Sequence, residues 1–245
     1  MFEKIDALRS EVDQRRPLSA DLMKIVAQKF REEWTYHTNA IEGNTFSYQE
    51  TAFFLREGLT VKGKSLREHL EIINHAEAID YLQEVITTRD LTERLIKDFH
   101  ALLFQGVRDI DFAPGEYKKH DNHVLTISGK IHHYTPAIQV PIEMEQLMLW
   151  YESNKTIIHP IQIAATFHHK LVAIHPFTDG NARVSRLAMN FILMKNGFPP
   201  AIIRNENRED YYAALEKADN GDLSLIIDLV AAEVKNNLDL MLSAL

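Results

Sequence analysis

The chain has 245 residues, of which 45% are hydrophobic and 25% charged, a balance typical of a globular protein with a sizeable core. Its net charge of −8 argues against the broad basic face that nucleic-acid binding requires, although a small nucleotide site needs only a few local cations. The absence of cysteine excludes disulfides, thiolate catalysis and cysteine-based zinc sites.

The N-terminal segment bears on where the protein resides. It carries charged residues from Glu3 onward, which is unlike a signal peptide. No apolar run in the sequence approaches the roughly 20 residues that a membrane-spanning helix needs. We therefore predict a cytoplasmic protein with no membrane partner and no nucleic-acid partner.

Helical periodicity dominates the first hundred residues. Apolar residues recur at helical spacing from about 19 to 40. Ser47 and Ser65 are each followed three positions later by glutamate, which is the capping-box pattern that starts a helix. Thr92 is suited to begin a further helix, so this part of the chain is expected to form an amphipathic bundle.

The pattern changes between about 113 and 136, where short alternating segments and turn residues appear. Val124 and Thr126 alternate before a Ser-Gly-Lys turn at 128–130, and this arrangement predicts a β-hairpin. A lone hairpin in a helical chain has no sheet to join. Either it packs as decoration, or it is a flap that presents its backbone edges to a ligand.

Helical patterns resume after the hairpin and continue to the end of the chain. Pro141 suits the first turn of one helix, and another begins near His159. Two last helices are predicted over about 208–218 and 222–244.

These elements predict an all-α fold, a helical bundle with a small β-hairpin flap. We assign residues 1–60 to an N-terminal helical lobe and residues 61–245 to the core of the fold. No long Pro- or Ser-rich linker separates the two parts.

The segment HPFTDGNARVSR at 175–186 concentrates the residues that are suited to chemistry. An apolar helix ends at His175, and a new helix is predicted just after the polar turn. The free amides and positive dipole end of that helix form an anion site, which Gly180 lets an anion approach closely. Arg183 and Arg186 share one helix face and can both reach a polyphosphate.

Two further side chains of this segment supply the remaining parts of a phosphoryl-type transfer. Asp179 offers the oxygen ligand that Mg²⁺ prefers, and His175 titrates close enough to neutrality to remove a hydroxyl proton. The loop is not a P-loop, because the chain contains no GxxxxGK[ST]. Each feature alone has a structural explanation as a helix cap or a solvated face, but the twelve residues together favour a catalytic loop.

The segment at 175–186 resembles the signature of the Fic (filamentation induced by cAMP) family, HPFx[DE]GNGRxxR. TNAIEGN at 38–44 resembles the family's inhibitory motif, [ST]xxxE[GN]. GKSLREHLEIINHAEAIDYL, the predicted hairpin and YYAALEKADNGDL are similar to the class with an N-terminal inhibitory helix, which includes an animal member in the endoplasmic reticulum. The resemblance covers about 34–240 and implies a Fic-type helical bundle.

The resemblance implies roles for individual side chains of the signature. His175 would be the catalytic base that deprotonates a Ser, Thr or Tyr hydroxyl, and Phe177 would anchor the loop in the core. Asp179 would bind the metal between the α- and β-phosphates, and Arg186 would bind the γ-phosphate. The implied ATP-binding residues are Lys130, Ile131, His132, His133, Asp179, Gly180, Asn181, Ala182, Arg183, Val184, Ser185, Arg186, Tyr211 and Tyr212.

Other implied roles lie outside the signature. Glu42 and Thr38 belong to the inhibitory motif, and Glu42 would pair with Arg186 when the enzyme is off. The hairpin around 130–133 would dock the target segment by strand addition. Tyr211 and Tyr212 would lie near the adenine, although either tyrosine could instead be a core residue.

The activity that the resemblance implies is AMP transfer from ATP to a protein hydroxyl, with Mg²⁺ or Mn²⁺ as the metal. The implied partners are a target protein, the chain itself as an auto-modification target, and a second copy that dimerises near Leu66. Removal of AMP from a modified protein at the same site is one alternative. A catalytically weak nucleotide-binding regulator is the other.

One residue departs from the family pattern. The second glycine of GNGR is Ala182 here. If this position has a positive φ, alanine costs about 1 kcal/mol. If it lies in the first helical turn, alanine is harmless to the backbone, although its methyl group could crowd the phosphates.

Overall fold

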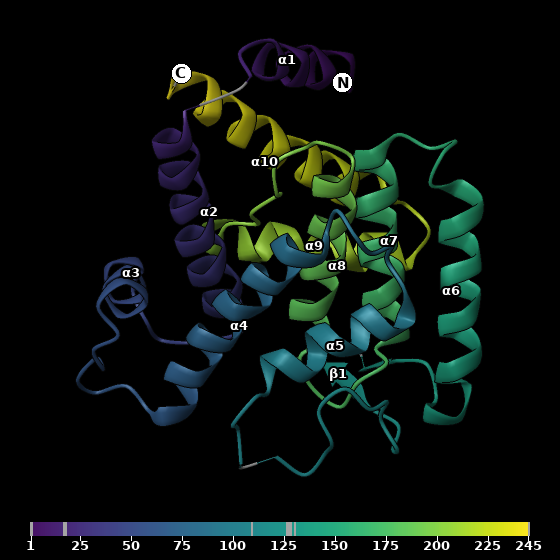
Figure 1. The fold of residues 1–245 in the computed structure, drawn as a ribbon. Helices are drawn as coiled ribbons and strands as arrows, with labels where there is room; N and C mark the ends of the chain where they lie inside the picture. Colours follow the sequence, from purple (N-terminus) through teal and green to yellow (C-terminus); the bar gives the residue numbers. More distant parts are fainter. Residues whose placement is uncertain (1, 17–18, 109, 126–128, 130, 245) are drawn as a thin grey trace.

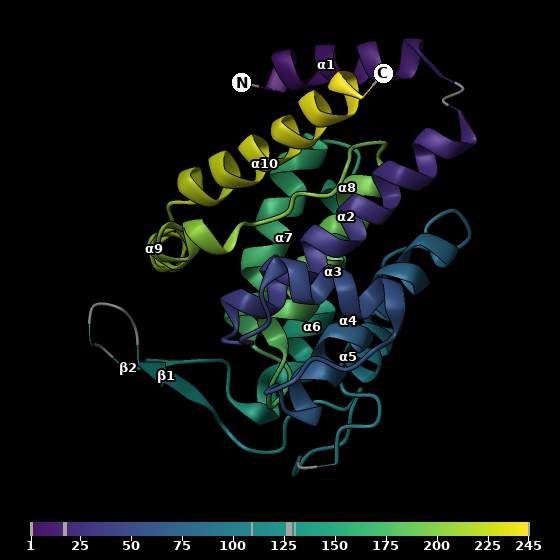
Figure 2. The ribbon, with the colours of Figure 1, turned by 90° about the vertical axis from the view of Figure 1, so that its left-hand side faces the viewer.

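The computed structural model describes residues 2–16, 19–108, 110–125, 129 and 131–244. Within these ranges the chain forms ten α-helices, two short 3₁₀ helices and one two-stranded antiparallel sheet (Figures 1 and 2). This confirms the prediction of an all-α bundle with a small hairpin. The elements are α1 (Phe2–Gln14), α2 (Ala20–Ile41), α3 (Tyr48–Glu57), α4 (Leu66–Val85), α5 (Glu93–Leu103), β1 (His123–Leu125), β2 (Ile131–His133), η1 (Ala137–Gln139), α6 (Val140–Asn154), α7 (Pro160–Ile174), α8 (Asn181–Lys195), η2 (Asn205–Asn207), α9 (Arg208–Asp219) and α10 (Ser224–Ser243).

Helix α8 forms the centre of the bundle. It contacts α4, α5 and α7, and Figure 1 shows it surrounded by other helices. Its side chains are buried on every face from Arg183 to Leu193. A helix that is buried all round is an interior helix, so the loop that precedes α8 is anchored deep in the core.

Several helix starts are set by the capping residues that the sequence predicts. Ser47 and Ser65 both form complete capping boxes, with Glu50 and Glu68 bonding back to the cap backbone. The Thr92 hydroxyl accepts a hydrogen bond from the amide of Leu95 at the start of α5. These caps satisfy amides that would otherwise lack helical partners.

Helix α1 lies outside the expected elements, which begin at about residue 19. It packs against α10, so the two ends of the chain meet at one side of the molecule (Figure 2). Ile5 and Val12 are buried there, and they belong to the same hydrophobic core as Phe30 of α2 and Phe167 of α7. Residues before position 60 thus share a core with the rest of the chain. The boundary at residue 60 stays a prediction.

The two strands of the hairpin lie at the edge of the helical bundle (Figure 2). Strands β1 and β2 pair in antiparallel register, with Val124 opposite His132. Of the predicted turn residues, Ser128 and Lys130 lie outside the described ranges, as does Thr126. Among the helices of the described ranges, none combines the length and apolar character that crossing a membrane requires.

Candidate active site

His175 ends α7 in an unusual backbone conformation. It is the only non-glycine residue with a positive φ in the described ranges, at 52°, and its ψ is 59°. A left-handed conformation of this kind costs about 1–3 kcal/mol and persists only when its surroundings hold it. It turns the chain sharply from α7 into the loop at 175–180, so the imidazole lies at the start of that loop.

The tautomer of His175 follows from one contact. Its Nδ1 lies 3.3 Å from the carbonyl oxygen of Val172. A carbonyl can only accept, so Nδ1 carries the proton and Nε2 is left as the basic nitrogen. Burial, aided by the positive charge of Lys118, lowers the pKa of His175 to about 4. This pKa is lower than the near-neutral one expected from the sequence, because burial disfavours the charged imidazolium. The imidazole is therefore neutral at physiological pH, and its Nε2 can accept a proton.

Phe177 anchors the loop in the core. It is fully buried and stacks on His100 with ring centroids 3.9 Å apart. The side chain of Asn181 brackets the same residue, accepting from Phe177 N and donating to Phe177 O at 2.8 Å each. The amide group of Asn181 is thus committed to bracing the loop. Its backbone N–H is the group left for the expected phosphate contact, which stays a prediction.

Gly180 is the N-cap of α8 and requires glycine for two reasons. Its φ is 75°, and a Cβ placed there would lie 2.6 Å from a ring carbon of Phe104. The first amide bonded within the helix is that of Val184, which donates to Gly180 O at 3.0 Å. The three preceding amides are the free donors of a helix N-terminus, and this is the arrangement that binds anions.

Ala182 lies in the first turn of α8, with no positive φ. The backbone therefore accepts alanine here without strain, and the first of the two alternatives for this residue is excluded. Val184 and Ser185 are fully buried, and the Ser185 hydroxyl donates to Asn181 O at 2.8 Å. Both side chains are directed into the core, and the expected place of Val184 and Ser185 among the ATP-binding residues stays a prediction.

Arg183 occupies the side of the loop next to α4. Its guanidinium lies 5.3 Å from the ring centroid of Phe104 and 3.9 Å from a carboxylate oxygen of Glu71. In the described part of the chain its Nε is a buried donor without a hydrogen-bond partner. Such a donor costs free energy unless a ligand satisfies it, so an incoming phosphate oxygen fits this position.

Asp179 supplies the only carboxylate of the signature. It accepts from the amide of Gly180 at 2.6 Å and from Arg67 Nη2 at 3.4 Å, and its side chain is 46% exposed. A half-exposed carboxylate beside an anion site suits Mg²⁺. Among the described residues no group of three His, Asp or Glu side chains is arranged to hold a metal. Phosphate oxygens of the nucleotide would therefore have to supply other ligands.

Arg186 is enclosed by helix α2. Its side chain is 2% exposed, and its Nη2 donates to Glu42 Oε1 at 2.7 Å. Thr38 accepts twice, through Oγ1 from Nε at 2.7 Å and through its carbonyl from Nη2 at 3.1 Å. The end of α2 and the second turn of α8 thus meet in one ion pair, in which Arg186 is buried and Glu42 is partly exposed.

Comparisons with known proteins agree with this geometry. A family model described as Fic/DOC family matches residues 90–193, which include the loop at 175–186. A Fic domain containing signaling protein from Bacteroides thetaiotaomicron superimposes with a TM-score of 0.92 at 30% identity, covering 98% of this chain and 96% of that one. The chain belongs to the Fic/DOC family.

Two further relatives of this Fic chain come from animals. The protein adenylyltransferase Fic of Nematostella vectensis is 34% identical over the whole chain, which spans 56% of that protein. The protein adenylyltransferase fic-1 of Caenorhabditis elegans is 37% identical over 81% of the chain, which spans 38% of that protein. The chain thus spans about half or less of the length of these curated relatives.

The two tyrosines near the Fic signature differ in exposure. Tyr211 is fully buried, and its hydroxyl lies 3.0 Å from His168 Nε2 and 3.5 Å from Arg186 Nη1. Its ring is enclosed by other residues in this structure, and its place beside the adenine stays a prediction. Tyr212 is half-buried, with the guanidinium of Arg208 5.0 Å from its ring centroid. It keeps the adenine role as a prediction.

The predicted flap residues belong to β2 and the turn before it. Ile131 is exposed on β2, and His132 Nδ1 lies 3.8 Å from Asp219 at the end of α9. His169 of α7 holds the same carboxylate at 2.9 Å. These contacts bring β2 close to α7 and α9. His133, the last residue of β2, is exposed and lies with its ring centroid 5.7 Å from that of His123. Lys130, the fourth flap residue of the predicted site, lies outside the described ranges.

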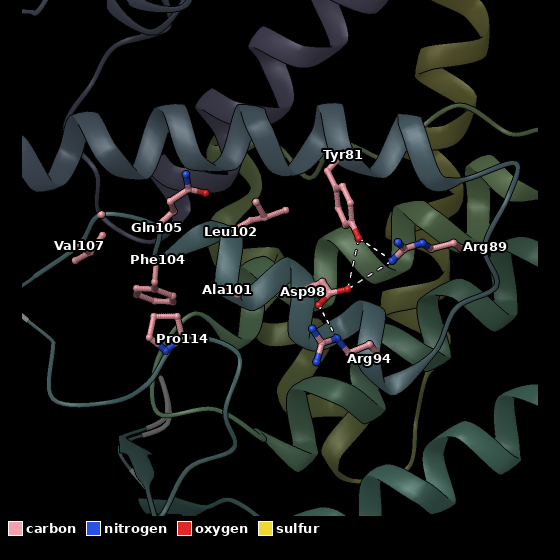
Figure 3. A pocket seen from close by; sticks show the side chains of 11 residues that line it. Tyr81, Arg89, Arg94, Asp98, Ala101, Leu102, Phe104, Gln105, Val107 and Pro114 are labelled. Atoms are coloured by element: carbon pink, nitrogen blue, oxygen red, sulfur yellow. Dashed lines mark hydrogen bonds and ion pairs between the residues drawn. The ribbon is translucent and has the colours of Figure 1, made fainter.

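Two hollows lie beside the Fic loop. The first has a volume of about 670 Å³ and is lined by residues of α4, α5 and the segment after α5. Figure 3 shows Arg89 and Arg94 directed at Asp98 at one end of this hollow. At the other end, Phe104 faces Pro114. The second, of about 530 Å³, lies between α6, α7 and the turn after α9, and Thr135 lines it. Neither hollow is lined by His175, so both are separate from the reaction centre.

Three residues that contact the site carry no signal in the sequence. Arg67, Lys118 and Tyr134 approach the catalytic loop from segments far away along the chain. The resemblance assigns them no role, and only the folded arrangement places them beside the loop.

Proposed function

We propose that this chain transfers AMP from ATP to a hydroxyl of a target protein. One observation carries the proposal: a neutral imidazole with a free Nε2 lies one short turn before the open N-terminus of α8. A base and an anion site in one loop are what nucleotidyl transfer requires. The relatives named protein adenylyltransferase support the same reaction.

The reaction follows from these groups. Nε2 of His175 takes the proton of the target hydroxyl as the hydroxyl oxygen attacks the α-phosphorus of ATP. A bond forms between that oxygen and phosphorus, the bond to the β-phosphate oxygen breaks, and pyrophosphate leaves. The free amides of α8 and the unsatisfied Nε of Arg183 stabilise the developing charge on the phosphate oxygens. Mg²⁺ held by Asp179 would neutralise charge on the phosphates.

The resting enzyme is autoinhibited through Arg186. Its guanidinium is occupied by Glu42, Thr38 and Tyr211, so it cannot reach a γ-phosphate without leaving them. A hydrogen bond between charged groups contributes about 1.5–3 kcal/mol. Such an energy corresponds to a factor of roughly 10 to 160 in rate. Release of Glu42 is the step that opens the site.

The partners of this reaction follow from two exposed features. The edge of β2, with Ile131 exposed, is the place where a target segment adds as a strand beside His175. Leu66, at the first position of α4, is 75% exposed and is the centre of a homodimer contact. The chain also modifies itself when Glu42 is removed.

The helical setting of Ala182 favours an active enzyme over a weak nucleotide-binding regulator. The backbone strain that would have indicated a decayed site is absent from this position. Removal of AMP by the same site remains the second candidate, since it uses the same His175 and phosphate cradle.

The test is mass spectrometry of the Glu42→Gly protein after incubation with Mg-ATP and a cell lysate. We expect a mass increase of one AMP on the enzyme and on a target hydroxyl, and none when His175→Ala is added. A Glu57→Gly variant, altered at the end of the neighbouring helix α3, is the matched control. Lack of AMP on every protein in the Glu42→Gly reaction would overturn the proposal.

A further inference from the structure

The aromatic ring of Tyr134 covers one face of the proposed catalytic base. The two ring centroids lie 3.7 Å apart, and the planes are nearly parallel, at 13°. Tyr134 follows directly after β2, so it belongs to the root of the flap. A single residue thus joins the element that would receive the target to the group that would take its proton.

The backbone at the flap root is fastened to the same loop. Tyr134 N donates to Asn122 O at 3.3 Å, and the side chain of Asn122 donates to Phe177 O at 3.3 Å. Lys118 N donates to Pro176 O at 2.9 Å. The two residues that follow His175 are therefore each bonded to the segment that leads into the flap.

Lys118 adds a side-chain contact to these backbone bonds. The residue is 5% exposed, and its ammonium group donates to Asn122 Oδ1 at 2.6 Å. It also lies 6.0 Å from the ring centroid of Tyr134. A buried cation with these contacts holds Asn122, and Asn122 in turn holds both Tyr134, directly after β2, and Phe177 in the loop after His175.

The imidazole needs such support. Its backbone is in a strained left-handed conformation, and the hydrogen bond from its side chain to Val172 O is long at 3.3 Å. A contact this weak leaves rotation of the ring about its side-chain bonds poorly restrained. The parallel Tyr134 ring restricts that rotation and keeps Nε2 directed at one position.

We propose that Tyr134 is a positioning residue that sets the imidazole plane of His175 and couples it to the flap. This inference rests on the proposed AMP transfer. Tyr134 touches neither the nucleotide nor the hydroxyl, and it acts through His175 alone. The stacked ring provides this function, and the phenol hydroxyl is not needed for it. Misplacement of a reacting group by about 1 Å can cost two orders of magnitude in rate.

The test compares Tyr134→Phe, Tyr134→Leu and Tyr134→Ala in the Glu42→Gly background, using auto-AMPylation with Mg-ATP. We expect Tyr134→Phe to keep kcat within about twofold, whereas the other two lower kcat by about 10- to 100-fold. The KM for ATP and the affinity for ADP should stay within about threefold in all variants. Tyr81→Ala, which removes a half-buried tyrosine of α4, is the control for general loosening of the fold.

A second readout is independent of activity. In the protein with ¹³C-labelled histidine, ring current from Tyr134 shifts the His175 signals upfield, and His175→Gln identifies them. The shift should persist in Tyr134→Phe and disappear in Tyr134→Leu and Tyr134→Ala. Equal kcat in Tyr134→Phe and Tyr134→Ala, or an equal loss in both, would overturn the proposal. Lack of transfer in Glu42→Gly itself would overturn the proposed function instead, and the NMR shift would still report whether the stack exists.

Discussion

Arg186 Nη2 lies 2.7 Å from Glu42 Oε1, although 144 positions separate the two residues along the chain. The pair joins the C-terminal end of α2 to α8, and it forms where the second arginine of the signature would meet a triphosphate. Thr38, one turn earlier on α2, holds the same guanidinium through its hydroxyl and its carbonyl. The guanidinium of Arg186, which would bind the γ-phosphate of ATP, is therefore already bonded to residues of the same chain.

Thr38→Val should destabilise the folded protein. It keeps the shape of the side chain but leaves Arg186 Nε buried without its acceptor, at a cost of about 1–3 kcal/mol in the free energy of unfolding. Thr38→Ser retains the hydroxyl and should lose less. Urea denaturation measures both, and equal stability of Thr38→Val and wild type would show that the hydroxyl contributes nothing.

Arg67→Gln should increase the affinity for the divalent metal. Arg67 competes for the Asp179 carboxylate, and an exposed ion pair of this kind is worth about 0.2–1 kcal/mol. The corresponding gain is about 1.4- to 5-fold, measured by Mn²⁺ titration with electron paramagnetic resonance in the presence of ADP. Arg31→Gln breaks a pair with Asp80 away from the site and should leave Mn²⁺ binding unchanged. Weaker Mn²⁺ binding by Arg67→Gln would contradict the competition.

Lowering the pH from about 6.5 to 4.5 should destabilise the fold through its buried histidines. Burial lowers the pKa of His100 to about 4 and that of His168 to about 3, while an unfolded histidine titrates near 6.5. In this window the unfolded state binds more protons than the folded state, so the free energy of unfolding falls as pH falls. Each such group contributes a slope of up to about 1.4 kcal/mol per pH unit.

The pH effect is checked by urea denaturation at several pH values in this window. His168→Gln should reduce the slope by one group's share. A free energy of unfolding that stays constant from pH 6.5 to 4.5 would contradict the assignment of neutral buried histidines.

Gly180→Ala should destabilise the loop more than the same change at another left-handed glycine. At Gly180 the new Cβ would lie 2.6 Å from the Phe104 ring, whereas at Gly197, with a φ of 79°, nothing lies within 4 Å. Overpacking costs about 1–3 kcal/mol beyond the backbone strain that both variants share. Thermal denaturation compares the two, and Phe104→Leu combined with Gly180→Ala should restore part of the loss. Equal melting temperatures for Gly180→Ala and Gly197→Ala would argue against a close contact.

Much of the helical framework could be predicted from local signals. The capping boxes at Ser47 and Ser65 determine helix starts through contacts three residues apart, which the sequence displays directly. Helix α1 could not be predicted in this way, because Ile5 and Val12 are buried only by docking against α10 at the far end of the chain.

Some features of the candidate site could likewise be predicted from the sequence, and others could not. The signature loop and the inhibitory motif are short contiguous patterns, so His175, Arg186 and Glu42 were accessible to sequence comparison. The left-handed backbone of His175 was not, since a positive φ outside glycine is imposed by surrounding contacts. The Tyr134 stack likewise depends on tertiary packing, and the burial of Tyr211 separates it from Tyr212 although both appear equally suited to bind adenine.

The central claim, AMP transfer suppressed by Glu42, is tested most directly with ATP labelled at either the α- or the γ-phosphate. Wild type, Glu42→Gly and Glu42→Gly with His175→Ala are compared at equal concentration. The account predicts that Glu42→Gly incorporates the α-label at least about 10-fold faster than wild type, never incorporates the γ-label, and loses labelling when His175 is replaced. Equal α-labelling by wild type and Glu42→Gly, or incorporation of the γ-label, would contradict it.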